Sequence, residues 1–182
     1  MKKEVYLTFD LDWLADDYLS VTIEMLQKYE LSATFFATHD SVALRELDED
    51  SCEIALHPNF DKGNGKYDLN ELIKLKKLYP EAGGTRSHSL FFSSRMLNLL
   101  KDCGMQYESN IFLMNHLGLQ PTKRTKSIWS LPFNWSDDKH LELEESMYIK
   151  NLPDLNQKGL NIFNFHPVHL FLNTPTLDHY EK

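Results

Sequence analysis

The chain has 182 residues, 42% of them hydrophobic and 25% charged, with a formal net charge of −8. This size and balance are typical of one soluble globular domain, so we expect a single domain over residues 1–182. The acidic charge argues against nucleic acid as a partner, and no apolar run reaches the roughly 18 residues needed for membrane insertion. Two cysteines and the lack of an apolar signal segment after Met1 favour a cytoplasmic location.

Strand-like and helix-like segments alternate along the chain. The expected strands, rich in β-branched and aromatic residues, are 4–10, 33–38, 52–57, a short one that leads into Thr85, 105–107, 128–131 and 161–165. The expected helices are 16–29, 41–47, one that follows a capping-box pattern of Asp68 and Glu71 and ends at Tyr79, and one from Ser93 or Ser94 to Gly104.

Strands that alternate with helices predict a parallel sheet. About seven strands in one short domain further predict a closed or nearly closed α/β barrel, and no internal repeat or linker between domains is visible. The stretch 115–127, which contains Gly118, Pro121 and several polar residues, is expected to be a long loop.

Titratable side chains gather at the carboxyl ends of four expected strands. They are Asp10, Asp12, His57, Arg86, His88 and His166. In parallel α/β folds these strand ends form the rim of the active site. The period of two along a strand also places Asp10 and Asp12 on one side, and the same holds for the second pair, 86 and 88. Each residue alone has a structural explanation, such as a helix cap or a strand end, but their shared location predicts a site.

The residue types suit a divalent metal and hydrolysis. One carboxylate with two imidazoles is a good ligand set for zinc and leaves positions for water and substrate. A second carboxylate could then accept a proton, and a histidine could protonate the departing group. His39 and His169 are expected near the same rim, where they would support the site or contact the substrate. The other histidines, His116, His140 and His179, are expected in surface loops.

Several segments match the pattern of one enzyme family. They are YLTFDLD at 6–12, with one residue inserted between the aspartates of a TFDDG element, ATFF at 33–36, EIALH at 53–57, TRSH at 85–88, LPFNW at 131–135 and FNFHP at 163–167. Through them the chain resembles the NodB-like polysaccharide deacetylases, carbohydrate esterase family four, from Val5 to about Leu170. The run HPNF at 57–60, followed by TRSHSL at 85–90, most resembles the WbmS-like branch, which is associated with synthesis of bacterial surface polysaccharides.

The resemblance implies a distorted (β/α)7 barrel of the NodB-like type and a metal-dependent carbohydrate deacetylase, with zinc as the expected metal. By the resemblance Asp10 would be the general base, Arg86 would hold it ionised and His166 would be the general acid. Asp12 and His57 would be metal ligands. Residue 135 falls on the stretch in which the family supplies a tryptophan.

Position 61 departs from the family pattern, which places two ligand histidines four residues apart. Asp61 stands four residues after His57, and the opposite register would use Glu53. Our preferred interpretation is that His88 supplies the missing imidazole from the neighbouring strand, and Asp61 as third ligand is the second choice. A third interpretation is that the metal site is lost and the domain only binds sugar.

The expected substrate is an acylated sugar, most simply an N-acetylated one, of a surface polysaccharide or of its precursor. Because no export signal is found, a cytoplasmic precursor such as a lipid-linked or nucleotide-linked sugar is favoured. Trp13, Trp135 and Phe60 are the aromatic candidates for stacking on a sugar ring, although core packing is the more frequent role of a single aromatic.

Two other functions stay open. One is a non-catalytic sugar-binding domain. The other is a phosphatase of the haloacid-dehalogenase type, because FDLD at 9–12 resembles the start of that family, with Asp10 as nucleophile and Asp12 as acid and base. That family continues with Gly-Thr, whereas this chain has Trp-Leu at 13–14, and the strand-end histidines would have no role in it.

Overall fold

The computed structural model describes residues 4–48, 50–63, 66–144 and 158–180. Within them, nine strands form one sheet in the spatial order β6-β7-β5-β4-β3-β2-β1-β9-β8, and all neighbours are parallel except β6 and β7. The strands are β1 (Glu4–Asp10), β2 (Ala33–Ala37), β3 (Cys52–Leu56), β4 (Gly84–Thr85), β5 (Tyr107–Glu108), β6 (Thr122–Lys123), β7 (Trp129–Ser130), β8 (Trp135–Ser136) and β9 (Leu160–Phe165).

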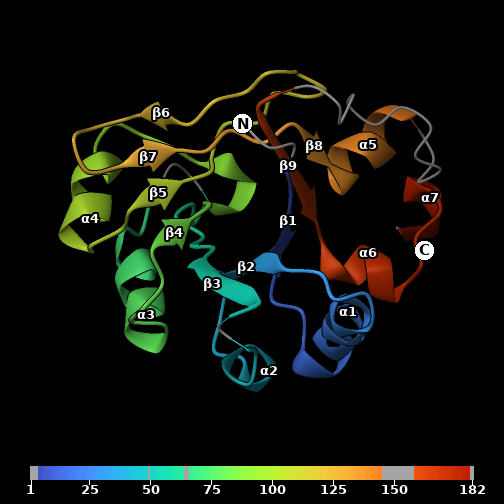
Figure 1. Cartoon of the computed structure of the whole chain (residues 1–182). Coiled ribbons are helices and arrows are strands. Elements are labelled where there is room, and N and C mark those ends of the chain that lie inside the picture. The colour runs from blue at the N-terminus through green and yellow to red at the C-terminus, as the bar shows by residue number, and fades with distance from the viewer. Residues whose placement is uncertain (1–3, 49, 64–65, 145–157, 181–182) are drawn as a thin grey trace.

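The sheet curls into a half-barrel, and helices cover its outer side (Figure 1). The helices are α1 (Asp16–Lys28), α2 (Val42–Arg45), α3 (Asn70–Leu78), α4 (Met96–Asp102), α5 (Asp137–Glu144), α6 (Pro167–Phe171) and α7 (Leu177–Tyr180), with a 3-10 helix, η1 (His88–Leu90). The predicted α/β architecture with a parallel sheet is therefore confirmed.

The number of strands differs from the expected seven, since the described residues form nine. In the described residues β6 and β8 stand at the two ends of the order of named strands. An isolated bridge between Phe112 and Phe133 nevertheless links the segment after β5 to the segment before β8, with a hydrogen bond from Leu113 N–H to Phe133 O at 2.9 Å. Five strands have only two residues each, which is too short for a hydrophobic period to reveal them. One of them, β6, lies inside the stretch 115–127 that was expected to be a loop.

The long strands carry the core and bring the ends of the chain together. β1 pairs with β2 on one side and with β9 on the other, with Phe9 opposite Phe35 and Phe165. The Phe9 ring stacks on these two rings with centroids 5.2 and 5.6 Å apart. Residue 166, which follows β9, is therefore placed beside Asp10 at the end of β1.

The start of α3 differs in detail from the predicted capping box. Asp68 accepts a hydrogen bond from the backbone N–H of Asn70 at 3.0 Å, before the helix begins. The Glu71 carboxylate does not complete the box but binds Lys74 at 2.8 Å and Lys62 at 3.3 Å. The helix ends before Pro80, as predicted.

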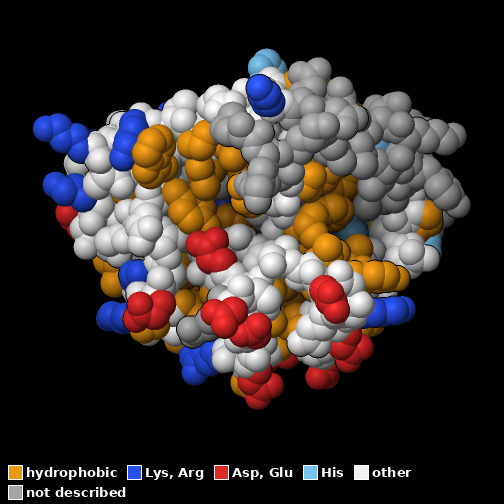
Figure 2. All heavy atoms as spheres, viewed as in Figure 1, with side chains coloured by type: hydrophobic (Ala, Val, Ile, Leu, Met, Phe, Trp, Pro, Cys, Tyr) orange, Lys and Arg blue, Asp and Glu red, His pale blue; other side chains and the backbone are white. Residues whose placement is uncertain are grey.

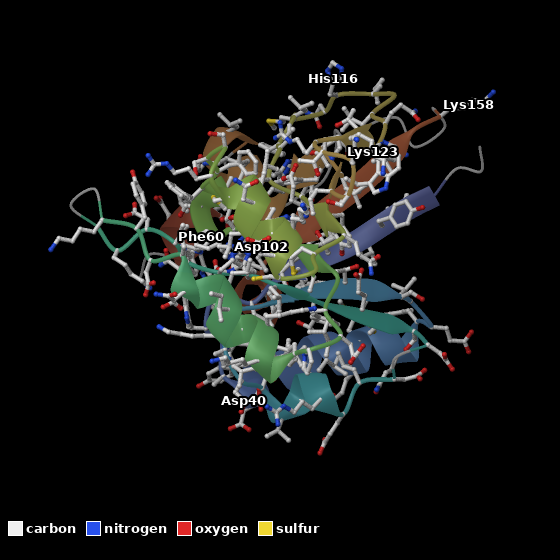
Figure 3. All side chains as sticks on the ribbon, turned by 90° about the vertical axis from the view of Figure 1, so that its left-hand side faces the viewer. Asp40, Phe60, Asp102, His116, Lys123 and Lys158 are labelled. Atoms are coloured by element: carbon white, nitrogen blue, oxygen red, sulfur yellow. The ribbon has the colours of Figure 1, made fainter. Side chains whose placement is uncertain are left out.

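The surface agrees with the acidic composition. Figure 2 shows carboxylates grouped over the lower part of one face, where α1, α2 and α3 lie. In Figure 3, His116, Lys123 and Lys158 lie at the end of the molecule opposite to Asp40. Among the described residues, no helix is both long enough and apolar enough to cross a membrane.

Candidate active site

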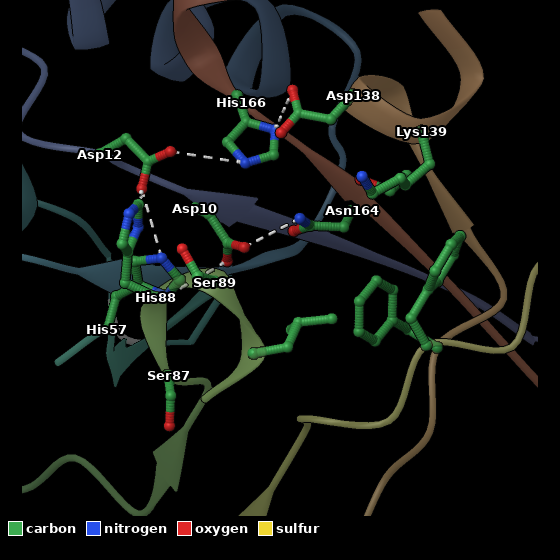
Figure 4. Close-up of a pocket in the computed structure, with 14 residues that line it drawn as sticks. Asp10, Asp12, His57, Ser87, His88, Ser89, Asp138, Lys139, Asn164 and His166 are labelled. Atoms are coloured by element: carbon green, nitrogen blue, oxygen red, sulfur yellow. Dashed lines mark hydrogen bonds and ion pairs between the residues drawn. The ribbon is translucent and has the colours of Figure 1, made fainter. Parts of the chain in front are cut away.

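The strand-end residues meet in a pocket of about 310 Å³, which we call the first pocket (Figure 4). Its walls include Asp10 and Asp12 from the end of β1, His57 after β3, His88 in η1 and His166 after β9. Four segments that are distant in the sequence thus deliver titratable side chains to one edge of the sheet, as expected for a parallel α/β fold.

A turn, and not strand alternation, brings Asp12 to this pocket. β1 ends at Asp10, and the next turn holds Asp12 and Trp13 at φ values of 45° and 61°. Left-handed backbone at two successive non-glycine residues is strained, and such strain is found most often at functional sites. The backbone N–H of Trp13 donates to Thr38 Oγ1 at 2.9 Å, which helps to hold the turn. Asp10 and Asp12 both line the pocket, as predicted, but the predicted reason, alternation along one strand, was wrong.

The second pair of residues also departs from simple alternation. β4 ends at Thr85, so neither Arg86 nor His88 is part of a strand. Arg86 is completely buried beneath the pocket, whereas His88 opens η1 on the pocket wall. Ser89 and Leu90, which follow, have φ values of 54° and 53°, a second strained turn beside the site.

Asp12, His57 and His88 form a cluster that could hold a metal ion. Asp12 Oδ1 lies 3.3 Å from His57 Nε2 and 3.2 Å from His88 Nδ1. Two ligand atoms, each roughly 2.0–2.1 Å from a tetrahedral zinc, are about 3.3–3.4 Å apart, so these separations fit such an ion. His57 Nδ1 is buried and has no hydrogen-bond partner, and the nearest carboxylate oxygen in the ion pairs is Asp10 Oδ1 at 3.8 Å.

The two alternative ligands do not join this cluster. Asp61 is exposed, and its Oδ1 accepts a hydrogen bond from the backbone N–H of Gly63 at 2.8 Å in its own loop. Glu53 Oε2 accepts hydrogen bonds from Thr34 Oγ1 at 3.0 Å and from Tyr107 Oη at 2.9 Å. Of the positions considered for the third ligand, only His88 lies beside Asp12.

Asp10 is held by two buried donors. Arg86 Nη1 donates to Asp10 Oδ1 at 3.0 Å, and Asn164 Nδ2 donates to Asp10 Oδ2 at 2.9 Å. The Arg86 guanidinium is itself sandwiched between the rings of Phe36 and Phe133, at 4.3 and 4.4 Å. This packing fixes the cation, and with it the carboxylate.

The electrostatic environment keeps both carboxylates ionised. Burial alone would raise the pKa of Asp10, but the charge of Arg86, with smaller contributions from His57 and His166, outweighs burial and lowers the pKa. Burial would also raise the pKa of Asp12, but its hydrogen bonds with His57 and His88 hold that pKa far below its usual value. The Asp12 contact raises the pKa of His88 in turn.

His166 is oriented by two carboxylates at the start of α5. Its backbone N–H donates to Asp137 Oδ2 at 2.6 Å, and its Nδ1 lies 2.7 Å from Asp137 Oδ1 and 3.3 Å from Asp138 Oδ1. Its Nε2 faces Asp12 Oδ2 at 3.6 Å, an arrangement visible in Figure 4. Burial would lower the pKa of His166, but the hydrogen bond with Asp137 raises it to about 10. His169 Nε2 contacts Asp138 Oδ1 at 3.0 Å and so lies behind His166.

Three site residues escaped the sequence analysis: Asn164, Asp137 and Asp138. Asn164 precedes His166 by two positions, so the period of two on β9 was the signal that could have identified it. The two aspartates directly follow the strand-like pair Trp135 and Ser136, which β8 was too short to reveal.

Burial decides the role of three further residues. Trp135 is 1% exposed and packs on Phe163 and Phe165, so it belongs to the core and offers no surface to a sugar. Phe60 is likewise buried. His140 lies buried in α5 against Trp135 and not in a surface loop, because α5 presents it to the core.

Trp13 and His39 remain near the rim. Trp13 is half-exposed, and its ring packs edge-on against His88 with centroids 5.0 Å apart. His39 Nδ1 lies 2.9 Å from Thr38 Oγ1, the acceptor of the Trp13 N–H. His39 thus supports the turn from behind and does not line the first pocket.

Comparison with known proteins identifies the family. A model described as "WbmS-like: Polysaccharide deacetylase" matches residues 7–182. The crystal structure of a candidate polysaccharide deacetylase involved in O-antigen biosynthesis, from Bordetella bronchiseptica, superimposes with a TM-score of 0.88 at 30% identity, over 98% of this chain and 77% of that chain. No curated protein matches the sequence significantly.

Two more distant structures share the fold alone. A candidate polysaccharide deacetylase from Mycobacterium smegmatis has a TM-score of 0.57 at 15% identity, over 90% of this chain and 76% of that chain. The 4-alpha-glucanotransferase of Thermococcus litoralis has a TM-score of 0.58 at 11% identity, over 91% of this chain and 33% of that chain. The interpretation of Asp10 and Asp12 as a haloacid-dehalogenase pair is not retained, because the family match covers nearly the whole chain. This chain belongs to the WbmS-like polysaccharide deacetylases.

Proposed function

We propose that this protein is a metal-dependent hydrolase that removes an acyl group, most simply N-acetyl, from a sugar of a surface polysaccharide or of its precursor. The observation that carries the proposal is the convergence of Asp12, His57 and His88 on the wall of a pocket that also contains Asp10 and His166. Membership of the family supports a carbohydrate substrate, and the Bordetella relative, which is involved in O-antigen biosynthesis, supports a surface polysaccharide.

Asp12, His57 and His88 would hold the metal, and their mixed oxygen and nitrogen donors suit zinc. The bound ion would supply Lewis acidity toward the acyl carbonyl and the attacking water. The buried Nδ1 of His57 faces Asp10 Oδ1 at 3.8 Å, which is beyond hydrogen-bond distance.

The proton transfers are assigned to Asp10 and His166. Asp10, held by Arg86 and Asn164, accepts a proton as water adds its hydroxyl to the acyl carbon. His166, whose ring is oriented by Asp137, gives a proton to the nitrogen as the carbon–nitrogen bond breaks. Water and an amide are thereby converted to a carboxylic acid and an amino sugar, so the reaction balances without any other reactant.

Acetate release tests this proposal. Purified protein is incubated with N-acetylated sugar nucleotides and N-acetylated oligosaccharides, before and after removal of metal by a chelator, and then with zinc restored. We expect acetate release that is lost with the chelator and recovered with zinc. The competing proposal of a sugar-binding domain without catalysis predicts that sugar binds, that no acetate appears and that zinc is not retained.

A further inference from the structure

A second group of side chains that could hold a metal ion lies beside the Asp12 cluster. It consists of Asp137, Asp138, His166 and His169, whose ligand atoms all lie within 4.8 Å of one another, and we call it the Asp138 cluster. The two aspartates open α5, while His166 follows β9 and His169 belongs to α6. Two segments that are distant in the sequence therefore bring two carboxylates and two imidazoles together.

The separations within the Asp138 cluster fit a zinc ion with small adjustments. Asp138 Oδ1 lies 3.3 Å from His166 Nδ1 and 3.0 Å from His169 Nε2, close to the roughly 3.3–3.4 Å between two ligands of a tetrahedral zinc. His166 Nδ1 lies 2.7 Å from Asp137 Oδ1, so this hydrogen bond would have to lengthen by about half an ångström. The Asp138 side chain is 45% exposed and can adjust without moving the core.

An ion can reach the Asp138 cluster without passing through the first pocket. A second pocket, of about 570 Å³, is lined by Asp138, His166 and His169 and opens on the other side of the His166 ring. Figure 4 shows the Asp138 carboxylate at the side of that ring opposite to Asp12, since Nδ1 faces Asp138 and Nε2 faces Asp12. The two clusters thus contact opposite nitrogen atoms of one imidazole.

The number of ligands separates the two clusters. The Asp12 cluster offers three ligands and leaves positions for water and substrate, as catalytic zinc sites do. The Asp138 cluster offers four ligands, which is the full set of a tetrahedral zinc. An ion in the Asp138 cluster would therefore have no position for substrate, and it would act on the reaction only through His166.

His166 links such an ion to the reaction. The proposed acid keeps Nδ1 in contact with Asp137 and Asp138 and directs Nε2 toward the first pocket. An ion at Nδ1 takes the place of the proton that this atom shares with Asp137, and that proton passes to water. Release of the remaining proton from Nε2 would then leave an anionic ring, which makes the metal-bound histidine a far weaker acid.

From this geometry we infer that the Asp138 cluster is a second and weaker zinc site, and that zinc bound there inhibits the hydrolysis. The site is weaker because the ion must displace a proton and open the hydrogen bond between His166 and Asp137. One equivalent of zinc fills the Asp12 cluster, only excess zinc fills the Asp138 cluster, and dialysis removes the second ion. The inhibition rests on the proposed function, whereas the binding of the ion does not.

The number of ions gives the first test. Metal-free protein is titrated calorimetrically with zinc, and we expect one tight and one weaker ion per chain. Asp138→Asn keeps the shape of the side chain but offers a poor ligand, and His169→Ala removes one imidazole, so each should lose only the weaker ion. The control His179→Ala removes an exposed histidine that lines neither pocket, and it should keep both ions.

The converse variant tests whether the two sites are independent. His88→Ala should lose the tight ion and keep the weaker one, because His88 belongs only to the Asp12 cluster. The tight ion retained by Asp138→Asn and by His169→Ala shows that these variants are folded. A single ion in the wild type, or a weaker ion that survives in both of them, would overturn the inference.

The effect of excess zinc on two substrates tests the inhibition. Hydrolysis of an N-acyl sugar should fall by roughly 10²-fold as the second ion binds, because His166 no longer serves as the acid. Hydrolysis of an activated ester, whose leaving group needs little protonation, should fall by less than about tenfold. Excess zinc should not slow Asp138→Asn, whereas His179→Ala should respond as the wild type does.

The outcomes separate this inference from the proposed function. Equal losses on amide and ester would show that zinc blocks the pocket and not the acid, and a second ion that leaves the amide rate unchanged would reject the inhibition. If no substrate is cleaved at all, the proposed function fails. The calorimetric count would still decide whether the Asp138 cluster binds zinc.

Discussion

Asn164 Nδ2 donates a hydrogen bond to Asp10 Oδ2 at 2.9 Å, while the Oδ1 atom of the same asparagine accepts hydrogen bonds from Arg86 Nη1 and from Thr8 Oγ1. The two donors on Oδ1 fix the orientation of the amide, so its NH₂ group must face Asp10. Asn164 therefore joins the Arg86 cation to the Asp10 carboxylate that this cation neutralises, in a network of buried side chains at the wall of the first pocket.

Exchange of this amide tests its role. Asn164→Asp has nearly the same shape and can still accept from Arg86, but it replaces the donor to Asp10 with a second carboxylate. We expect kcat to fall about tenfold or more while KM stays within about threefold, because Asp10 loses a charge-assisted hydrogen bond. Steady-state kinetics on the best substrate, with metal content measured in parallel, give the readout. A loss confined to KM would instead make Asn164 a substrate contact.

The third metal ligand can be assigned by metal content. His88→Ala removes one donor of the Asp12 cluster. The affinity for zinc should therefore fall at least tenfold, and less zinc should be retained after dialysis. Asp61→Ala is the matched control, since Asp61 is exposed and bonded to its own loop, and its zinc content should equal that of the wild type. The reverse result would return the role to Asp61.

Asp10 can be separated from the metal ligands in the same way. Asp10→Asn keeps the shape and can still accept from Arg86, so the protein should fold and retain zinc. Turnover should fall by roughly 10²-fold or more, because the amide cannot accept a proton from water. Normal turnover in this variant would exclude Asp10 as the base.

Much of this site could be predicted because it depends on strand order. The runs that end at Asp10, His57 and Phe165 are long enough to show their pattern, and parallel strands bring their carboxyl ends together. The details that could not be predicted depend on backbone turns and very short strands. The φ of 45° at Asp12 has no sequence signature, and β8, with two residues, gives no period from which to place Asp137.

Burial of polar residues was the other obstacle. Asn164 is a buried amide in a strand, and its role depends on a hydrogen bond from Arg86, 78 positions away. No local sequence pattern reveals such a contact. His140 was misplaced for the same reason, since only the packing of α5 on Trp135 makes it a core residue. Sequence reasoning therefore found the groups that follow long strands and missed those whose place depends on contacts between distant segments.

Asp16 gives a prediction on stability that is independent of the site. Its carboxylate accepts from the backbone N–H of Val42 at 2.9 Å and is bonded to Ser41 Oγ, which joins α1 to the start of α2. The hydrogen bond from Ser41, partly opposed by burial, lowers the pKa of Asp16. Asp16→Ala should cost about 1 kcal/mol, or roughly 2–4 °C in Tm, with the exposed neighbour Asp17→Ala as control.

The sign of the pH dependence follows from that lowered pKa. A carboxyl group whose pKa is lower in the folded state stabilises the fold above its unfolded pKa and loses this effect as the pH falls through the folded value. The Tm difference between wild type and Asp16→Ala should therefore be complete at pH 7 and should shrink below the ordinary pKa of 3.8. Thermal unfolding monitored by circular dichroism between pH 3 and pH 7 measures it, and a difference that grows in acid would contradict the assignment.

His166 is where the proposed chemistry is most exposed to test. An amine leaves an amide slowly unless its nitrogen is protonated as the bond breaks, so the acid must face the acyl group beside Asp12. His166 Nε2 lies 3.6 Å from Asp12 Oδ2, and the contacts of its Nδ1 with Asp137 favour the protonated ring. His166→Ala should keep zinc and slow the hydrolysis of an amide by 10²-fold or more. It should slow the hydrolysis of an activated ester, whose leaving group needs little protonation, by less than about tenfold.

Asp137→Asn should show the same selectivity with a smaller loss, because it weakens the orientation of the His166 ring and its hold on the proton without removing the acid. Equal losses on amide and ester in both variants would mean that His166 binds the substrate, and the acid would then be sought in His169, 3.0 Å from Asp138 on the far side of the same carboxylate.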